Sequence, residues 1–96
     1  MRRAKKSKYK SVVIKKKRYY FYKITWADIT GDAGHASSFD FMGFMPSIMV
    51  THAYMFSKDR KHVRTFASYE EGDELFSDRN VFPRGCILKM EKVILK

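Results

Sequence analysis

Residues 19–29 read YYFYKITWADI, and this stretch decides the fold. It is dense in aromatic and β-branched residues, contains neither proline nor glycine, and ends at the turn-forming Thr30-Gly31-Asp32. This composition predicts a β-strand. Every second residue from Tyr20 to Trp26 shares one face of that strand, and we expect this aromatic face to point into the core.

Further strands are predicted on both sides of this one. Residues 47–56 and 62–69 flank a charged turn of hairpin size, and residues 86–95 form a closing strand. Upstream, Val12-Val13-Ile14 either extends the first strand or forms a separate edge strand. No helical period is sustained, so the sequence predicts an all-β domain of four to five antiparallel strands. A small closed or nearly closed barrel protects strand edges best at this size.

The connection between the first two long strands is rich in aromatic residues. Residues 31–38 are small, polar and interrupted by glycine, which is typical of a loop. Phe39, Phe41 and Phe44 follow, and a nearby glycine and proline leave little room for a helix. We expect this segment to lay aromatic side chains over the open end of the core.

The first eighteen residues carry half of the chain's cationic residues. Ten of the 20 Lys and Arg residues lie there without any Asp or Glu, whereas residues 19–96 hold the other ten and all ten acidic residues. The net charge of +10 therefore belongs to this segment. The sequence predicts a basic N-terminal arm over residues 1–18 and a small β-barrel domain over residues 19–96. Basic arms of this kind typically bind nucleic acid.

We expect the arm to contact phosphate groups without sequence preference, with secondary contacts from the charged hairpin turn. Tyr9 lies among the arm's cations and suits stacking on unpaired bases. Docking of the arm on an acidic protein surface remains an alternative. Removal of residues 1–17 should abolish binding and leave the melting temperature nearly unchanged. The expected nucleic-acid-binding residues are Arg2, Arg3, Lys5, Lys6, Lys8, Tyr9, Lys10, Lys15, Lys16, Lys17, Arg18, Arg60, Lys61 and Arg64.

Other kinds of site are poorly represented. The spacing of Asp28, Asp32 and His35 matches no metal-ligand motif, and Asp32 is typical of a turn. Cys86 is the only cysteine, which excludes an internal disulfide and favours a reducing compartment. Phosphate loops, nucleophile elbows and paired-cysteine zinc motifs are missing from the sequence. We therefore expect no catalytic residue, no metal and no cofactor, and a protein that is not an enzyme.

Three short motifs follow one another across residues 22–95: Trp26-Ala27-Asp28-Ile29, Gly31-Asp32-Ala33-Gly34-His35 and Val81-Phe82-Pro83-Arg84-Gly85-Cys86-Ile87. In this order they resemble the W-x-D-x-x-x-D-x-G/W opening and the I-P-k-g-x-I turn of small phage-encoded SH3-like β-barrel proteins. The resemblance implies an SH3-like barrel in which Pro83 and Gly85 form a short helical turn before the last strand. It implies no particular activity.

Two functions from different classes follow. The first is a phage-type small non-enzymatic nucleic-acid-binding or nucleoprotein accessory protein that contacts phosphates through its basic arm. The second is a host-takeover adaptor or inhibitor that binds a host protein through exposed aromatic residues such as Phe39, Phe41 and Phe44. No apolar run is long enough for a signal or membrane segment, so we expect no membrane partner. The expected location is the cytoplasm, and that of the host cell for a phage-encoded chain.

Overall fold

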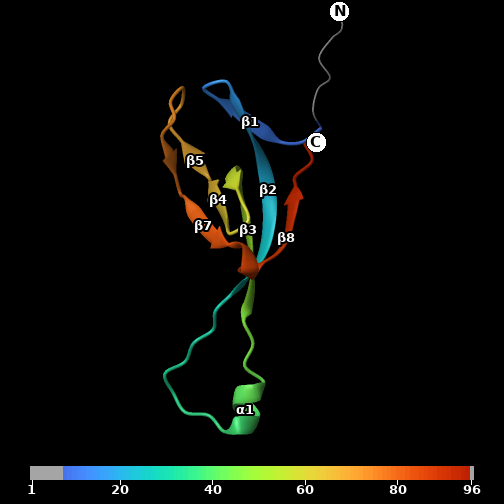
Figure 1. Cartoon of the computed structure of the whole chain (residues 1–96), viewed down its shortest axis with the longest axis vertical. Coiled ribbons are helices and arrows are strands. Elements are labelled where there is room, and N and C mark those ends of the chain that lie inside the picture. Colours follow the sequence, from blue (N-terminus) through green and yellow to red (C-terminus); the bar gives the residue numbers. More distant parts are fainter. Residues whose placement is uncertain (1–7, 96) are drawn as a thin grey trace, which may run out of the picture.

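A computed structural model describes residues 8–95 of the chain. The protein is built mostly of antiparallel β-strands, as predicted for an all-β domain (Figure 1). Its elements, in chain order, are β1 (Ser11–Ile14), β2 (Lys17–Asp28), α1 (Ser38–Met42), β3 (Ser47–Lys58), β4 (His62–Phe66), β5 (Ser68–Tyr69), β6 (Phe76–Ser77), β7 (Asn80–Pro83), the 3-10 turn η1 (Arg84–Cys86) and β8 (Ile87–Lys92).

The main sheet is organised around β2. Its strand order is β1-β2-β3-β4-β7, and β8 pairs with β2 outside this order. The first residues of β2 pair with β1, while residues 22–26 lie between β8 on one edge and β3 on the other. β5 and β6 form a separate two-stranded sheet. The aromatic stretch at residues 19–29 therefore supplies most of the central strand of the fold.

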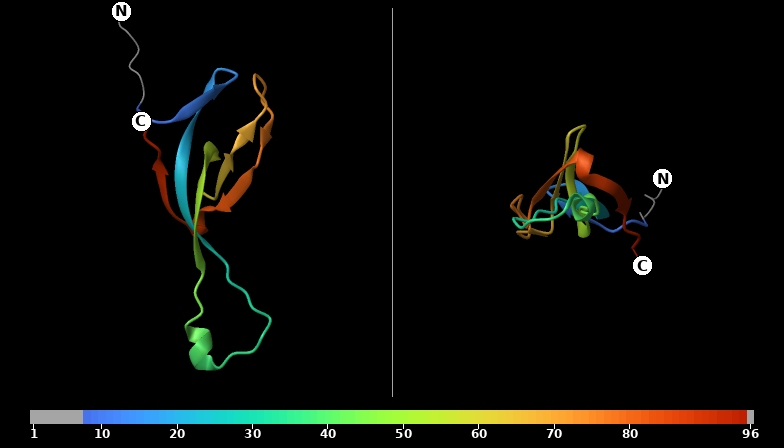
Figure 2. Two further views of the ribbon diagram at one scale, coloured as in Figure 1. Left: turned by 180° about the vertical axis from the view of Figure 1, so that it is seen from behind. Right: turned by 90° about the horizontal axis from the view of Figure 1, so that it is seen from below.

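The main sheet curves around an interior but stays open over residues 8–95. β1 and β7 are the two ends of its hydrogen-bonded order, and no pairing joins them in that part of the chain. The left-hand view of Figure 2 shows β2 (cyan) and β8 (red) on one side of the body and β7 (orange) on the other. The all-β class is thus confirmed, whereas the sheet is open where the sequence predicts a barrel.

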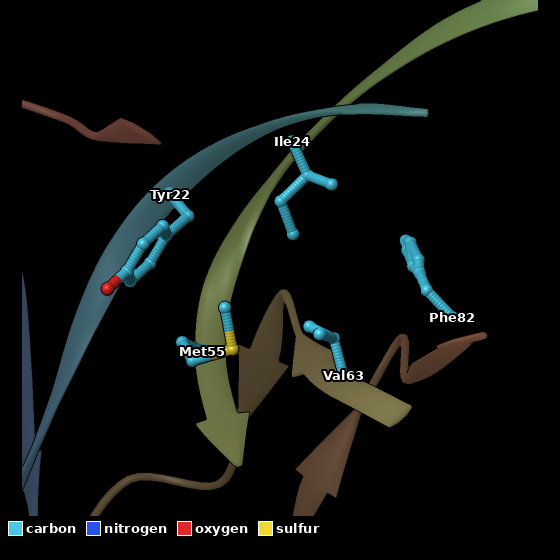
Figure 3. Close-up of a cluster of buried hydrophobic side chains, with 5 residues drawn as sticks. All are labelled: Tyr22, Ile24, Met55, Val63 and Phe82. Atoms are coloured by element: carbon cyan, nitrogen blue, oxygen red, sulfur yellow. The ribbon is translucent and has the colours of Figure 1, made fainter. Parts of the chain in front are cut away.

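One hydrophobic cluster lies on the face of β2 that the alternation pattern predicts. Tyr22 and Ile24 of β2 point toward side chains of β3, β4 and β7 (Figure 3). The partly buried Trp26 packs against the same cluster and donates a hydrogen bond from Nε1 to Oγ1 of Thr51 at 2.9 Å. The buried members are Tyr22, Ile24, Met55, Val63 and Phe82.

A second hydrophobic cluster lies on the opposite face, near the start of β2. Its buried members are Ile14, Tyr19 and Phe66. The Tyr19 ring meets Phe66 edge-on at 5.3 Å between centroids, and Phe76 of β6 covers the cluster at 5.8 Å from Tyr19. β2 therefore buries one face near its start and the other face near its middle.

Residues 8–18 belong to the folded body, which corrects the predicted boundary at residue 18. β1 pairs with β2 from Ser11↔Tyr20 to Ile14↔Lys17. Ahead of β1, the amide of Lys10 donates to the carbonyl of Val93 at 2.9 Å. The physical reason is that Ile14 is apolar and completes the second cluster, so the strand that carries it is drawn into the sheet. Removal of residues 1–17 would take away β1 and the buried Ile14, so it should lower the melting temperature, where the sequence predicts almost no change. Residues 1–7 of the predicted arm lie outside the described residues.

The aromatic connection is also corrected, because it does not cover the core. Residues 29–46 connect β2 to β3, are all exposed and project from one end of the body, with α1 near the far end of the connection (Figure 1). We call residues 29–46 the projecting loop. The Ser37 hydroxyl caps α1 by accepting from the amide of Asp40 at 3.1 Å, and Phe39 is 88% exposed. β2 and β3 continue beyond the last β8 pair at Trp26, so their connection begins well away from the core.

Two neighbouring substitutions in β1 test whether this strand is part of the fold. Ile14 is 3% exposed and Val13 is 51% exposed. We expect Ile14→Ala to lower the free energy of unfolding by about 2–5 kcal/mol, because it removes buried methyl groups and leaves a cavity. Val13→Ala should cost about 1 kcal/mol or less. Urea unfolding of both variants measures the difference, and equal small losses would show that β1 is not packed.

Candidate nucleic-acid interface

The tip of the β1–β2 hairpin concentrates positive charge. Lys15 and Lys16 alone form the loop between the two strands, with φ angles of 50° and 69°. A two-residue hairpin loop with positive φ at both positions favours Asn-Gly, because larger L residues are strained there. Lysine at both positions, followed by Lys17 and Arg18, places four consecutive cations at the tip. We call residues 15–18 the basic tip.

The cations of the basic tip are exposed and form no ion pair with a carboxylate among residues 8–95. All four residues are exposed. The Arg18 guanidinium donates a hydrogen bond from Nη1 to Oγ of Ser11 at 2.6 Å. The positive charge of the tip is therefore available to an external anion. The ion pairs within residues 8–95 lie elsewhere, at Arg64–Asp59 and Lys89–Glu91.

The β5–β6 hairpin brings negative charge to the same end of the body. Figure 2 shows the two hairpins rising side by side, opposite to the projecting loop. Burial, and then the negative charge of Glu74, raise the pKa of Tyr19. A polyanion on the basic tip is consequently directed away from this acidic neighbour. The acidic residues of the β5–β6 turn are Glu70, Glu71, Asp73 and Glu74.

Lysines stacked on aromatic rings extend the positive surface along the chain ends. Tyr9 forms a bridge with Ile94. The Tyr9 ring centroid lies 5.4 Å from Nζ of Lys8 and 5.2 Å from Nζ of Lys92, which also lies 4.2 Å from the Tyr20 ring. Such cation–π contacts stabilise surface ammonium groups. Stacking of Tyr9 on a nucleic-acid base stays a prediction, since lysines already lie over its ring.

The structure brings together only some of the predicted nucleic-acid-binding residues. Lys8, Tyr9 and Lys10 lie on the β1 side with the basic tip, and Lys10 Nζ is 4.1 Å from the Phe21 ring centroid. The β3–β4 turn lies apart from them, because the carbonyl of Lys61 accepts from the amide of Arg84 in η1 at 2.8 Å. η1 lies at the end from which the loop projects (Figure 1). Four of the predicted nucleic-acid-binding residues lie outside the described part of the chain: Arg2, Arg3, Lys5 and Lys6.

The β3–β4 turn is ordered by a carboxylate that also offsets part of its charge. Oδ1 of Asp59 accepts from the amides of Lys61 and His62, both at 2.8 Å. These backbone hydrogen bonds hold the pKa of Asp59 below its ordinary value. Oδ2 of Asp59 lies 3.5 Å from Nη1 of Arg64. Of the three predicted cations here, Arg60 and Lys61 remain without an ion pair in residues 8–95.

Sequence reasoning missed Lys92. This residue ends β8, and its aromatic partners Tyr9 and Tyr20 lie near the other end of the chain. The alternation of the closing strand could place Lys92 on a face, but no local signal indicates which strand lies beside it.

The weaker candidate sites have structural roles. Oδ1 of Asp32 accepts from the amide of Gly34 at 2.9 Å, which confirms its predicted place in a turn. The thiol of Cys86, at the end of η1, donates to the carbonyl of Pro83 at the end of β7 at 3.2 Å. No group of three or more His, Cys, Asp or Glu side chains suited to a metal occurs among residues 8–95.

Comparisons with known proteins found no match that could help to interpret the interface. No protein-family model, no curated protein and no solved structure matches this chain. In the described part of the chain no helix is long and apolar enough to cross a membrane.

The strained loop of the basic tip gives a prediction about stability. Lys15→Asn with Lys16→Gly should raise the free energy of unfolding by about 1 kcal/mol, because Asn-Gly suits positive φ at both positions. Lys15→Gln with Lys16→Gln removes the same charges and keeps the strain, so it should leave stability nearly unchanged. Chemical denaturation compares the two. A gain in the Gln pair equal to that of the Asn-Gly pair would assign the effect to charge repulsion instead of backbone strain.

Proposed function

We propose that the protein is a small non-enzymatic nucleic-acid-binding or nucleoprotein accessory protein that contacts phosphates through its basic N-terminal segment. The observation that carries this proposal is the basic tip: four consecutive exposed cations on a two-residue loop, without a carboxylate partner among residues 8–95. Cations that replace condensed counterions on a polyphosphate bind it strongly at low salt.

The hairpin supports this function in a way that a free arm would not. β1 fixes the base of the tip through its pairing with β2 and through buried Ile14. Less conformational entropy is lost on binding when the contacting backbone is already ordered. Lys8, Lys10 and Lys92 add charge along the adjoining edge.

We propose in addition that the chain is of phage type and related to small SH3-like barrels. η1 at Arg84–Cys86 follows Pro83 and precedes the last long strand, at the place where the resemblance implies a helical turn. The open sheet would then be an incompletely closed form of that barrel. On the same basis we propose function in the cytoplasm, within the host cell for a phage-encoded protein.

Salt dependence of binding tests the basic tip. Fluorescence anisotropy with a labelled 20-nucleotide oligomer at several salt concentrations measures the slope of log affinity against log salt. Lys15→Gln with Lys16→Gln should weaken binding and reduce the slope by about two units, because each lost phosphate contact contributes close to one.

The matched control removes two cations from the η1–β8 region. Arg84→Gln with Lys89→Gln changes the net charge equally and should alter affinity and slope much less. Binding that is insensitive to salt, or equal effects of the two pairs, would contradict a role for the basic tip.

A second candidate function is favoured by the projecting loop. Phe39, Phe41 and Met42 at its tip are all exposed, and residues 24–57 contain three Asp but no Lys or Arg. Exposed apolar patches of this kind mark protein interaction sites. We propose as the alternative that this loop makes the protein an adaptor or inhibitor of a host protein.

Nuclease treatment separates the two functions. If the protein is an adaptor, its immobilised form should still bind one host protein in a saturable manner after nuclease digestion. The double variant Phe39→Ser with Phe41→Ser should no longer bind that host protein, and its stability should be unchanged because both side chains are exposed. Leu88→Ser, an exposed apolar residue of β8, is the control. Loss of the retained protein on digestion, or its retention by the loop variant, would count against the adaptor function.

A further inference from the structure

A pocket of about 480 Å³ opens beside the second hydrophobic cluster. Phe56 of β3, Phe66 of β4 and Val81 of β7 supply its apolar surface, and Arg64 and Arg79 supply positive charge. Pockets that bind small organic groups have this size and this combination of apolar walls with few polar groups. The combination suits a flat apolar ring that carries an anion.

Phe56 connects this pocket to the basic tip. One face of its ring stacks on Tyr19, with centroids 6.0 Å apart and planes 5° from parallel. Nζ of Lys17 lies 5.9 Å from the Phe56 centroid and 5.4 Å from that of Tyr19. The cations of the hairpin and the aromatic wall of the pocket therefore form one continuous surface.

The two arginines differ in their availability. Arg64 reaches Asp59 at 3.5 Å through Nη1, which leaves its other N–H groups for a further acceptor. The Arg79 side chain has no hydrogen bond or ion pair within residues 8–95. A guanidinium group binds phosphate oxygens in a bidentate manner and also stacks on planar rings.

We propose that this pocket binds one unpaired nucleotide of a strand whose neighbouring phosphates lie on the basic tip. The proposal rests on the proposed nucleic-acid function and assigns it a substrate class, single-stranded nucleic acid. A base in a duplex is stacked and paired and cannot enter a pocket, whereas an unpaired base exposes its ring to aromatic and guanidinium groups. The exposed side chains of Phe56 and Val81 contact the base, and Arg64 and Arg79 contact its phosphate.

Competition between strand forms tests the proposal with the full chain. Binding of labelled oligo-dT, oligo-U, a duplex of equal length and thymidine monophosphate is measured at one low salt concentration. We expect both single strands to bind at least about ten-fold more tightly than the duplex, because aromatic stacking on a base has that effect. Oligo-dT and oligo-U differ in the sugar and in the thymine methyl group, so oligo-dU, which has the DNA sugar and the same base as oligo-U, is added to identify the preferred sugar.

Variants assign the preference to the pocket. Arg79→Gln and Phe56→Leu should each reduce single-strand affinity by about ten-fold and leave duplex affinity nearly unchanged. Arg84→Gln, a matched arginine in η1, should change neither. Arg79 is exposed and without partners in residues 8–95, so its variant is expected to fold even if Phe56→Leu is unstable.

Several results would overturn the inference. Equal affinity for single strand and duplex would show that the pocket does not bind an unpaired base. Equal losses of both affinities in Arg79→Gln would show that Arg79 contributes only non-specific electrostatic attraction. Monophosphate binding as tight as that of the oligomer would assign the pocket to a free nucleotide. The absence of any nucleic-acid binding at low salt would instead contradict the proposed function itself.

Discussion

The structure depends on β2, a single strand that is buried on different faces along its length. Tyr19 near its start belongs to one cluster, and Tyr22 and Ile24 near its middle belong to the other. The same strand pairs with β1, β3 and β8. In a domain of this size neither cluster is large, so each stabilises the other through the backbone they share. Loss of pairing along β2 would expose both.

This arrangement also separates the two candidate interaction surfaces. The basic tip lies at the start of β2 and the projecting loop begins where β2 ends (Figure 1). Residues 24–57 carry three Asp and no Lys or Arg, in a chain whose net charge is +10. The protein is therefore electrostatically polarised along one strand. A polyanion and an apolar partner could occupy the two ends together, because neither surface overlaps the other.

The sequence predicts those features that depend on local pattern. The aromatic alternation of β2, the β3–β4 hairpin and the turn before β8 follow from side-chain parity and turn residues. For residues 12–14 the sequence allows either an extension of the first strand or a separate edge strand, and the structure shows the second, β1. Local pattern cannot choose between the two, because the choice depends on the packing of Ile14 against Tyr19 and Phe66. The charge of residues 8–18 suggests a free arm, yet a few apolar side chains bind that segment to the sheet. The pocket combines residues of β3, β4 and β7, and sequence spacing alone cannot bring Phe56 and Arg79 together.

Amide hydrogen exchange of the full chain tests most directly whether β2 holds the basic segment in the fold. Backbone hydrogen bonds protect amides according to the free energy of opening. Slow exchange is predicted for the paired residues of β1 and for residues 19–26 of β2, and fast exchange for the projecting loop. Exchange in β1 as fast as in the projecting loop would show that the basic segment is a free arm and would contradict a hairpin packed on β2.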